Sequence, residues 1–184
     1  MIKVIENFLP NAIFNRIKGV VNSPHFKWSR YENIVGTSVQ IPPYKTVDGF
    51  SNIVEVMNYR ETGIFLPLMD CVAEELGVTP GDIMRTYVNV TTPQYGWKSE
   101  DIAYPHIDDI VPHTVSLFYI DNADGDTILF DNFGPDMNQD FKIHSRIRPE
   151  PNKLLIFDGS RFHSGNPPLT DRKRIVVNMN FRKQ

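Results

Sequence analysis

The sequence predicts an α+β protein that is mainly β, a two-layered β-sandwich with helices packed on one outer face. Residues 1–80 carry two helical patterns, whereas residues 81–184 fall into short stretches rich in β-branched and aromatic residues. The 14 prolines favour many turns over a helical bundle. A chain of 184 residues suits one domain, with residues 1–80 as an N-terminal helical support region and residues 81–184 as the β core.

Two helices are expected in the first region. The first begins near Pro10, where apolar residues recur at helical spacing: Ile13, Phe14, Ile17, Val20 and Val21. The second spans about 64–76 and ends at Gly77, a residue that suits the left-handed position after a helix. Its buried face consists of Phe65, Leu68, Met69, Val72 and Leu76.

Six strands are expected after Pro80. They are short, and clusters of Gly, Pro, Asn and Asp separate them: 83–90, 113–121, 127–130, 141–147, 154–157 and 174–181. The pair Asp124-Gly125 predicts a hairpin turn that joins two of these strands.

Charge and cysteine usage exclude several classes of protein. The net charge is −3, from 19 basic and 22 acidic residues, so no broad basic surface for nucleic acid is evident. The lone Cys71 cannot form an intramolecular disulfide or a thiolate cluster. The sequence shows neither a signal-peptide pattern nor a run of about 18 apolar residues, so we expect a cytoplasmic protein without a membrane span.

Histidine and aspartate are spaced as metal ligands in the second region. His106 and Asp108 are two positions apart, and side chains at that spacing share one face of a strand. His163, which follows the apolar stretch 154–157 and a turn, is the best candidate for a third ligand. Two histidines and one carboxylate leave coordination positions open, the arrangement of non-haem Fe(II) sites that activate O₂.

A basic residue follows the third candidate ligand. Arg174 begins the last expected strand, and a guanidinium aimed into the sandwich can bind a carboxylate through two parallel hydrogen bonds. Lys173 or Arg172 could fill the same role, but Arg174 shares its strand face with Val176 and Asn178. Dry walls for the pocket are expected from Val115, Leu117, Ile156 and Val176.

Together these segments resemble the 2-oxoglutarate/Fe(II) dioxygenases, and most of all the prolyl-hydroxylase-like branch with its small bacterial and phage members. The resemblance covers about residues 83–181 and keeps the order of the motifs. It is carried by Tyr104-Pro105-His106-Ile107-Asp108, Leu117-Phe118-Tyr119-Ile120-Asp121, Gly125-Asp126-Thr127-Ile128-Leu129-Phe130, Leu155-Ile156-Phe157-Asp158 with His163 downstream, and the strand from Arg174 to Phe181.

The resemblance implies a double-stranded β-helix of the jelly-roll or cupin-like kind, and Fe(II), 2-oxoglutarate and O₂ as cofactor and co-substrates. It implies a metal triad of His106, Asp108 and His163, with Arg174 on the C5 carboxylate of 2-oxoglutarate. Tyr119 matches a tyrosine that often hydrogen-bonds the same carboxylate, and a further contact is expected from Tyr87.

The implied reaction hydroxylates a C–H bond and releases succinate and CO₂. The presence of Asp108 argues against halogenation, because related halogenases lack this carboxylate. The prolyl-hydroxylase likeness favours a peptidyl or protein side chain, proline first, while small molecules and nucleobases remain open as substrates. Two alternatives are a cupin-like metalloenzyme without oxidative chemistry and a jelly-roll binding module.

Residues 91–105 form a long connection that contains Trp97. It is either a lid over the substrate or an idle surface loop.

Overall fold

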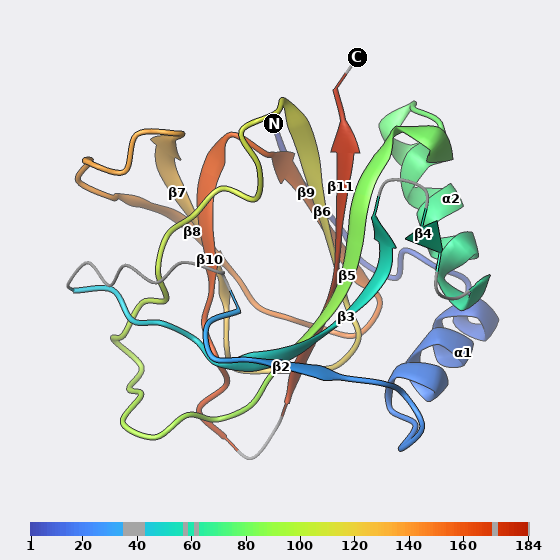
Figure 1. The fold of residues 1–184 in the computed structure, drawn as a ribbon, viewed down its shortest axis with the longest axis horizontal. Helices are drawn as coiled ribbons and strands as arrows, with labels where there is room; N and C mark the ends of the chain where they lie inside the picture. Colours follow the sequence, from blue (N-terminus) through green and yellow to red (C-terminus); the bar gives the residue numbers. More distant parts are fainter. Residues whose placement is uncertain (35–42, 57–58, 61–62, 171–172, 184) are drawn as a thin grey trace.

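The computed structural model describes residues 1–34, 43–56, 59–60, 63–170 and 173–183, and within them two antiparallel sheets lie face to face (Figure 1). The strands are β1 Ile2–Ile5, β2 Ser29–Tyr31, β3 Gly49–Val56, β4 Tyr59–Arg60, β5 Ile83–Thr91, β6 His113–Tyr119, β7 Thr127–Phe133, β8 Ile143–Ile147, β9 Lys153–Asp158, β10 Arg161–Gly165 and β11 Arg174–Arg182. The helices are α1 Asn11–Val21 and α2 Leu66–Leu76, with short 3-10 turns at Gly63–Phe65 and Pro80–Asp82.

The two sheets differ in size. The major sheet has the order β1-β9-β6-β11-β5-β3-β2, with β4 paired to β3, and the minor sheet has the order β10-β7-β8. This architecture confirms the predicted fold class, a mainly β double-stranded β-helix. The first 80 residues do more than support the core, because β1 extends one edge of the major sheet and β3 and β2 extend the other.

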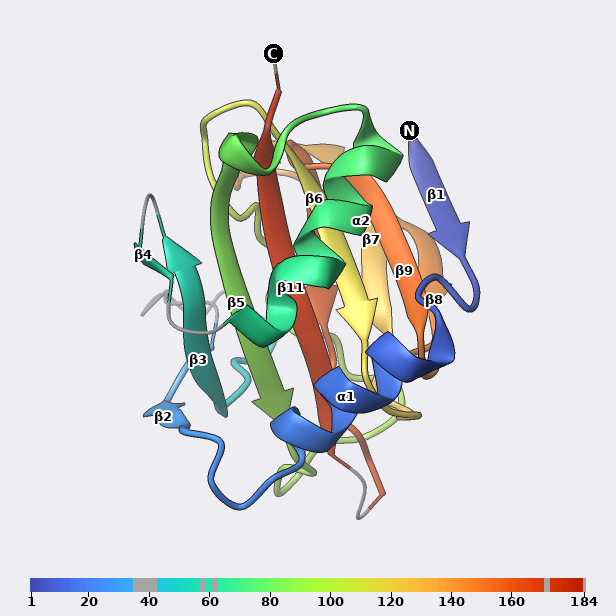
Figure 2. The same cartoon turned by 90° about the vertical axis from the view of Figure 1, so that its right-hand side faces the viewer.

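Both helices cover the outer face of the major sheet, as predicted (Figure 2). Helix α1 buries Phe14, Ile17 and Val21, and the ring of Phe14 meets that of Phe118 edge to face at 6.1 Å. Helix α2 has a proline in its first turn and ends at Gly77, whose φ of 69° is the left-handed conformation that glycine adopts without strain. Each fully buried aliphatic or aromatic side chain contributes about 1.5–3 kcal/mol to this packing.

Alternation along the strands divides the core into two layers. On β9, Leu154 and Ile156 pack with the helices, whereas Leu155 and Phe157 pack between the sheets. The prediction that Ile156 lines the pocket is therefore wrong, because its side chain points to the helical layer. The inner layer does contain the other predicted wall residues, Val115, Leu117 and Val176.

The predicted hairpin at Asp124-Gly125 is also wrong. Strand β6 pairs with β9 and β11, and β7 pairs with β10 and β8, so this turn carries the chain from one sheet to the other.

Four strands had not been predicted: β2, β3, β4 and β10. Strand β10 contains Arg161, His163 and Ser164, a polar composition typical of a turn, and its pairing with β7 makes it a strand.

No helix in the described parts of the chain is long and apolar enough to cross a membrane.

Candidate active site

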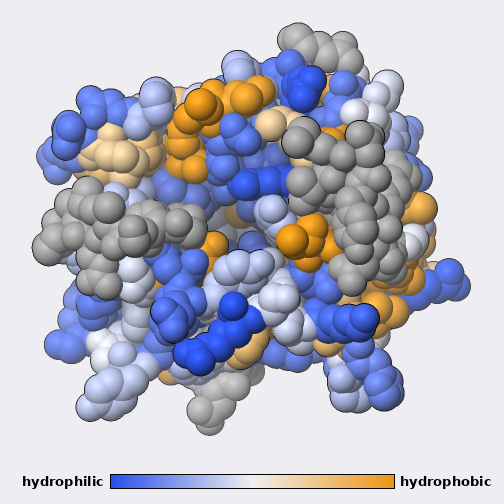
Figure 3. All heavy atoms as spheres, in the orientation of Figure 1, coloured by the Kyte–Doolittle hydropathy of each residue, from blue (hydrophilic) through white to orange (hydrophobic). Residues whose placement is uncertain are grey.

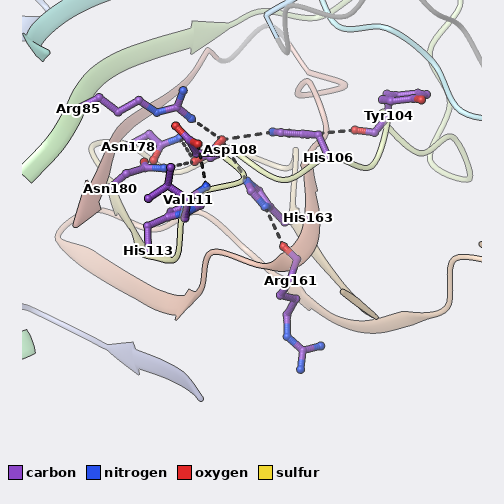
Figure 4. A network of polar contacts seen from close by, with 11 residues as sticks. Arg85, Tyr104, His106, Asp108, Val111, His113, Arg161, His163, Asn178 and Asn180 are labelled. Atoms are coloured by element: carbon purple, nitrogen blue, oxygen red, sulfur yellow. Dashed lines mark hydrogen bonds and ion pairs between the residues drawn. The ribbon is translucent and has the colours of Figure 1, made fainter. Parts of the chain in front are cut away.

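Three predicted ligands meet between the sheets (Figure 4). One potential ligand atom from each of His106, Asp108 and His163 lies within 4.8 Å of the other two. The Nε2 atom of each histidine is 3.7 Å from Asp108 Oδ1, and the two imidazole centroids are 4.4 Å apart. Two imidazole nitrogens and one carboxylate oxygen thus face a common point.

Backbone pairing brings the two histidines together. His106 and His163 form an isolated antiparallel bridge in which each N–H donates to the other's carbonyl at 2.9 Å. Residues directly opposite in an antiparallel pair project side chains to the same face, which aligns the two rings. His106 and Asp108 were expected to lie on one extended strand. In the structure only His106 forms a bridge, and the chain bends at Asp108. The orientation of His106 therefore comes from its bridge to His163 and not from a strand.

Hydrogen bonds on the far side of His106 and Asp108 fix the orientation of these two ligands. His106 Nδ1 lies 3.2 Å from the Tyr104 carbonyl, which directs Nε2 toward Asp108. Asp108 Oδ2 accepts from the side-chain amides of Asn178 and Asn180, both at 3.0 Å, and this leaves Oδ1 facing the histidines. Such supporting contacts are characteristic of metal sites, because they set the tautomer and angle of each ligand.

The electrostatics keep all three groups in the protonation states that bind metal. Burial lowers the pKa of His163 to about 3, with a further contribution from His106, and burial also lowers the pKa of His106. Burial alone would raise the pKa of Asp108, but the neighbouring His163, Arg85 and His106 outweigh it and hold that pKa below its usual range. At neutral pH the site therefore presents two neutral imidazoles and a carboxylate.

The buried neutral histidine predicts a pH-dependent stability in the metal-free protein. An unfolded His163 gains a proton below pH 6.5, while the folded one stays neutral down to about pH 3. The unfolded state binds more protons in this window, so the free energy of unfolding falls as the pH falls. We expect His163 to account for a loss of about 2 kcal/mol between pH 7 and pH 5, measured by urea unfolding.

His163→Gln should remove this part of the pH dependence, because glutamine does not titrate. An identical slope in the wild type and the His163→Gln variant would contradict the prediction.

The triad opens into a cavity of about 280 Å³ between the sheets. Figure 3 shows the recess near the middle of this face, with hydrophilic residues along much of its rim. Alternate positions of β5 (Arg85, Tyr87, Asn89 and Thr91) and of β11 (Arg174, Val176 and Asn178) line it. Leu117 supplies a further apolar wall.

Arg174 lies in this cavity, as predicted. It is buried, donates from Nε to the Gly125 carbonyl at 2.9 Å and donates from Nη2 to Thr127 Oγ1 at 2.7 Å. These two hydrogen bonds fix the plane of the guanidinium, and neither of them uses Nη1. Burial lowers the pKa of Arg174, but an arginine side chain stays charged at neutral pH. Lys173 is exposed and does not line the cavity, and Arg172 lies outside the described residues.

Tyr119 lies beside Arg174, whose guanidinium carbon is 6.0 Å from the centre of the Tyr119 ring, and both side chains bond to Thr127. Burial raises the pKa of Tyr119 to about 12, and its hydroxyl donates to Thr127 Oγ1 at 2.7 Å. Thr127 lines the cavity and accepts from both side chains, so its own hydroxyl hydrogen remains for another acceptor. No role in the site was predicted for Thr127, because its contacts with Tyr119 and Arg174 depend on how the two sheets face each other. The role predicted for Tyr87 stays a prediction, although Tyr87 does line the cavity.

Gly165 allows the close approach of Arg174. A Cβ at position 165 would lie 3.2 Å from both Nη1 and Nη2 of that guanidinium, so an alanine must displace it by a few tenths of an ångström. We expect Gly165→Ala to weaken 2-oxoglutarate binding by about 1 kcal/mol, roughly fivefold, through one impaired charged hydrogen bond. Isothermal titration with Mn(II)-loaded protein measures this. Gly19→Ala, where nothing lies within 4 Å of the added carbon, is the control and should bind normally.

The long connection after β5 is fastened away from the cavity. Lys45 pairs with Asp101 at 2.5 Å, donates to the Gly96 carbonyl at 3.1 Å and lies over the Trp97 ring at 5.6 Å. No residue from 92 to 105 is among the described residues that line the cavity. The lid and the idle surface loop both stay predictions, and in this structure Trp97 lies over Lys45 and does not line the cavity.

Comparison with solved structures identifies the fold. The chain superimposes on the non-haem α-ketoglutarate-dependent epimerase SnoN from nogalamycin biosynthesis with a TM-score of 0.68, at 10% identity over 99% of this chain and 81% of that one. A Trichoplax adhaerens prolyl hydroxylase, solved with a peptide of hypoxia-inducible factor, gives 0.66 at 17% identity, over 98% and 83%. A Pseudomonas putida prolyl-4-hydroxylase gives 0.59 at 13% identity, over 99% and 92%.

The fold is therefore the double-stranded β-helix of the 2-oxoglutarate/Fe(II) oxygenases. No protein-family profile matches the sequence, and no curated protein sequence matches it either.

Proposed function

We propose that this protein is an Fe(II)- and 2-oxoglutarate-dependent oxygenase that hydroxylates an unactivated C–H bond and releases succinate and CO₂. One observation carries the proposal. A His-Asp-His cluster and a buried arginine line the same cavity, and the inward-facing positions of β11 connect them. A protein that only binds a metal would need the His-Asp-His cluster but not the arginine. The arginine adds a binding group for a carboxylate at a distance from the metal.

The residues present fit Fe(II). Two neutral imidazoles and one carboxylate supply three ligands and leave positions for other molecules. The carboxylate oxygen that would bind the metal is kept toward the histidines by the two amides on its partner oxygen. Bound Fe(II) would supply the activation of O₂ that couples oxidative decarboxylation of 2-oxoglutarate to oxygen insertion into the substrate.

The protein's own residues would position the co-substrate and keep water out. Arg174 and the Thr127 hydroxyl would bind the distal carboxylate of 2-oxoglutarate, since both present donors to the cavity. Tyr119 would hold Thr127 in place through its hydroxyl. Leu117 and Val176 would form the dry wall between the anchor and the triad, which strengthens the electrostatic contacts there.

The substrate we propose first is a peptidyl or protein side chain, with proline as the first residue to test. The support is the shared fold with two prolyl hydroxylases, one of which was solved with a peptide. A small-molecule substrate is the alternative, supported by the likeness to an epimerase of antibiotic biosynthesis. A non-oxidative cupin-like enzyme would have no use for the Arg174 anchor, so the buried guanidinium argues against it.

Anaerobic titration of the protein with Fe(II) and 2-oxoglutarate tests the proposal. We expect a weak visible charge-transfer band at about 500 nm, the signature of a keto acid chelated to iron. A screen of peptides and metabolites for stimulated succinate release then searches for the substrate. Tight metal binding without the band, whatever the concentration of 2-oxoglutarate, would favour the cupin-like alternative.

A further inference from the structure

Arg85 on β5 places a second guanidinium in the cavity, beside the triad (Figure 4). Its Nη2 lies 3.0 Å from Asp108 Oδ1, the oxygen that also faces both histidines. The side chain is 25% exposed, and the guanidinium lies 5.4 Å from the centre of the Tyr87 ring. Arg85 is therefore held at the reactive end of the cavity, and Arg174 forms the separate anchor described above.

The donors of Arg85 are largely unused. Across the described ranges of the chain, Arg85 makes the ion pair with Asp108 but donates no hydrogen bond, and its Nε is buried without an acceptor. Asp108 does not need Arg85 for its orientation, because Asn178 and Asn180 already bind its other oxygen. A buried N–H without an acceptor is costly, so the placement of the Arg85 Nε indicates an acceptor that arrives with a ligand.

The charge of the cavity also favours the binding of a further anion. The described side chains of fixed charge that line it are Arg85, Arg174 and Asp108. A histidine that binds a metal does so as the neutral imidazole. Two guanidinium groups and one carboxylate leave one positive charge. A divalent cation and the 2-oxoglutarate dianion cancel each other, so this positive charge persists in the loaded site. A further monoanion would neutralise it.

We infer that Arg85 binds a carboxylate of the substrate beside the C–H bond that is oxidised. The inference rests on the proposed function and narrows it. The substrate is either a peptide with an acidic side chain or a free C-terminus next to the reacting residue, or a free amino or organic acid. The Nε and Nη2 edge of arginine matches the two oxygens of a carboxylate. When a metal takes over Asp108 Oδ1, both donors of this edge are available to the substrate.

Nuclear magnetic resonance of a simple carboxylate tests the inference without turnover. The whole protein is loaded with Mn(II) and saturating 2-oxoglutarate, so that the Arg174 anchor is occupied. Acetate is the probe, and the paramagnetic relaxation of its methyl protons reports binding beside the metal. We expect strong relaxation in the wild type and a decrease of at least about tenfold in Arg85→Gln, since one charged hydrogen-bonded contact is lost. Arg85→Lys should restore part of it.

Matched measurements separate this role from a structural one. Arg146→Gln, which removes an exposed arginine on β8, should leave acetate relaxation unchanged. Arg85→Gln should bind Mn(II) at least as tightly as the wild type, because a neighbouring positive charge is removed. If Arg85 only positioned Asp108, the variant would bind Mn(II) more weakly, and that result would overturn the inference.

The remaining outcomes are equally decisive. Protein that binds Mn(II) and 2-oxoglutarate but does not relax acetate overturns the inference and leaves the proposed function standing. Failure to bind Mn(II) or 2-oxoglutarate counts against the proposed function itself. Relaxation of methyl phosphate in place of acetate overturns the choice of a carboxylate.

Succinate release distinguishes the two kinds of substrate. Stimulation by free acids but not by their amides identifies the substrate as a small acid. Stimulation by peptides with an acidic residue next to the reacting one identifies it as a peptide. Either result supports the inference.

Discussion

Alanine at position 163 is expected to abolish 2-oxoglutarate turnover and to weaken binding of Fe(II) or Mn(II) by more than about a hundredfold. The substitution leaves only one imidazole and one carboxylate at a site where three ligand atoms now converge within 4.8 Å. The backbone bridge between residues 106 and 163 does not involve the imidazole, so the fold should persist. Metal titration and circular dichroism on the same sample measure both effects.

The same loss is expected for His106→Ala. For the carboxylate, Asp108→Asn is the sharper change, because Asp108→Ala would also leave Asn178, Asn180 and Arg85 without their partner. His144→Ala removes an exposed histidine on β8 and should bind metal like the wild type. Near-normal metal affinity and succinate production in His163→Ala would show that the triad is assigned incorrectly.

The second large effect is expected from Arg174→Ala. The variant should retain its metal affinity and need far more 2-oxoglutarate, because a buried charge-assisted contact is worth about 2–5 kcal/mol, roughly thirtyfold or more in affinity. The guanidinium is fixed by Gly125 and Thr127 before any ligand binds, so no reorganisation offsets the loss. Isothermal titration of 2-oxoglutarate into Mn(II)-loaded protein measures the change.

Two further variants test the arrangement of this anchor. Tyr119→Phe should weaken 2-oxoglutarate by about 1–2 kcal/mol at most, since its hydroxyl acts through Thr127. Lys173→Ala should have no effect, because the exposed Lys173 does not line the cavity. A large effect of Lys173→Ala together with a normal Arg174→Ala variant would place the anchor one residue earlier.

Local patterns predicted much of the fold. The apolar spacing in α1 and α2 reflects one buried face each, and the structure confirms both helices on the predicted side of the sandwich. The predictions for β5, β6, β9 and β11 were also confirmed, because their β-branched and aromatic side chains pack on the faces of the major sheet. Strand β10 was not predicted because three of its five residues are polar, and its partner β7 is distant in sequence.

The sequence by itself determined which residue types could form a metal site and an anion anchor, since His106, Asp108, His163 and Arg174 stand in a recognisable order. Only the tertiary structure decided what surrounds them. The bridge between His106 and His163, the contact of Thr127 with Arg174 and the position of Arg85 beside Asp108 all join segments far apart in the chain. Residue spacing records neighbours along one strand or helix, whereas these contacts depend on which strands pair and how the two sheets face each other.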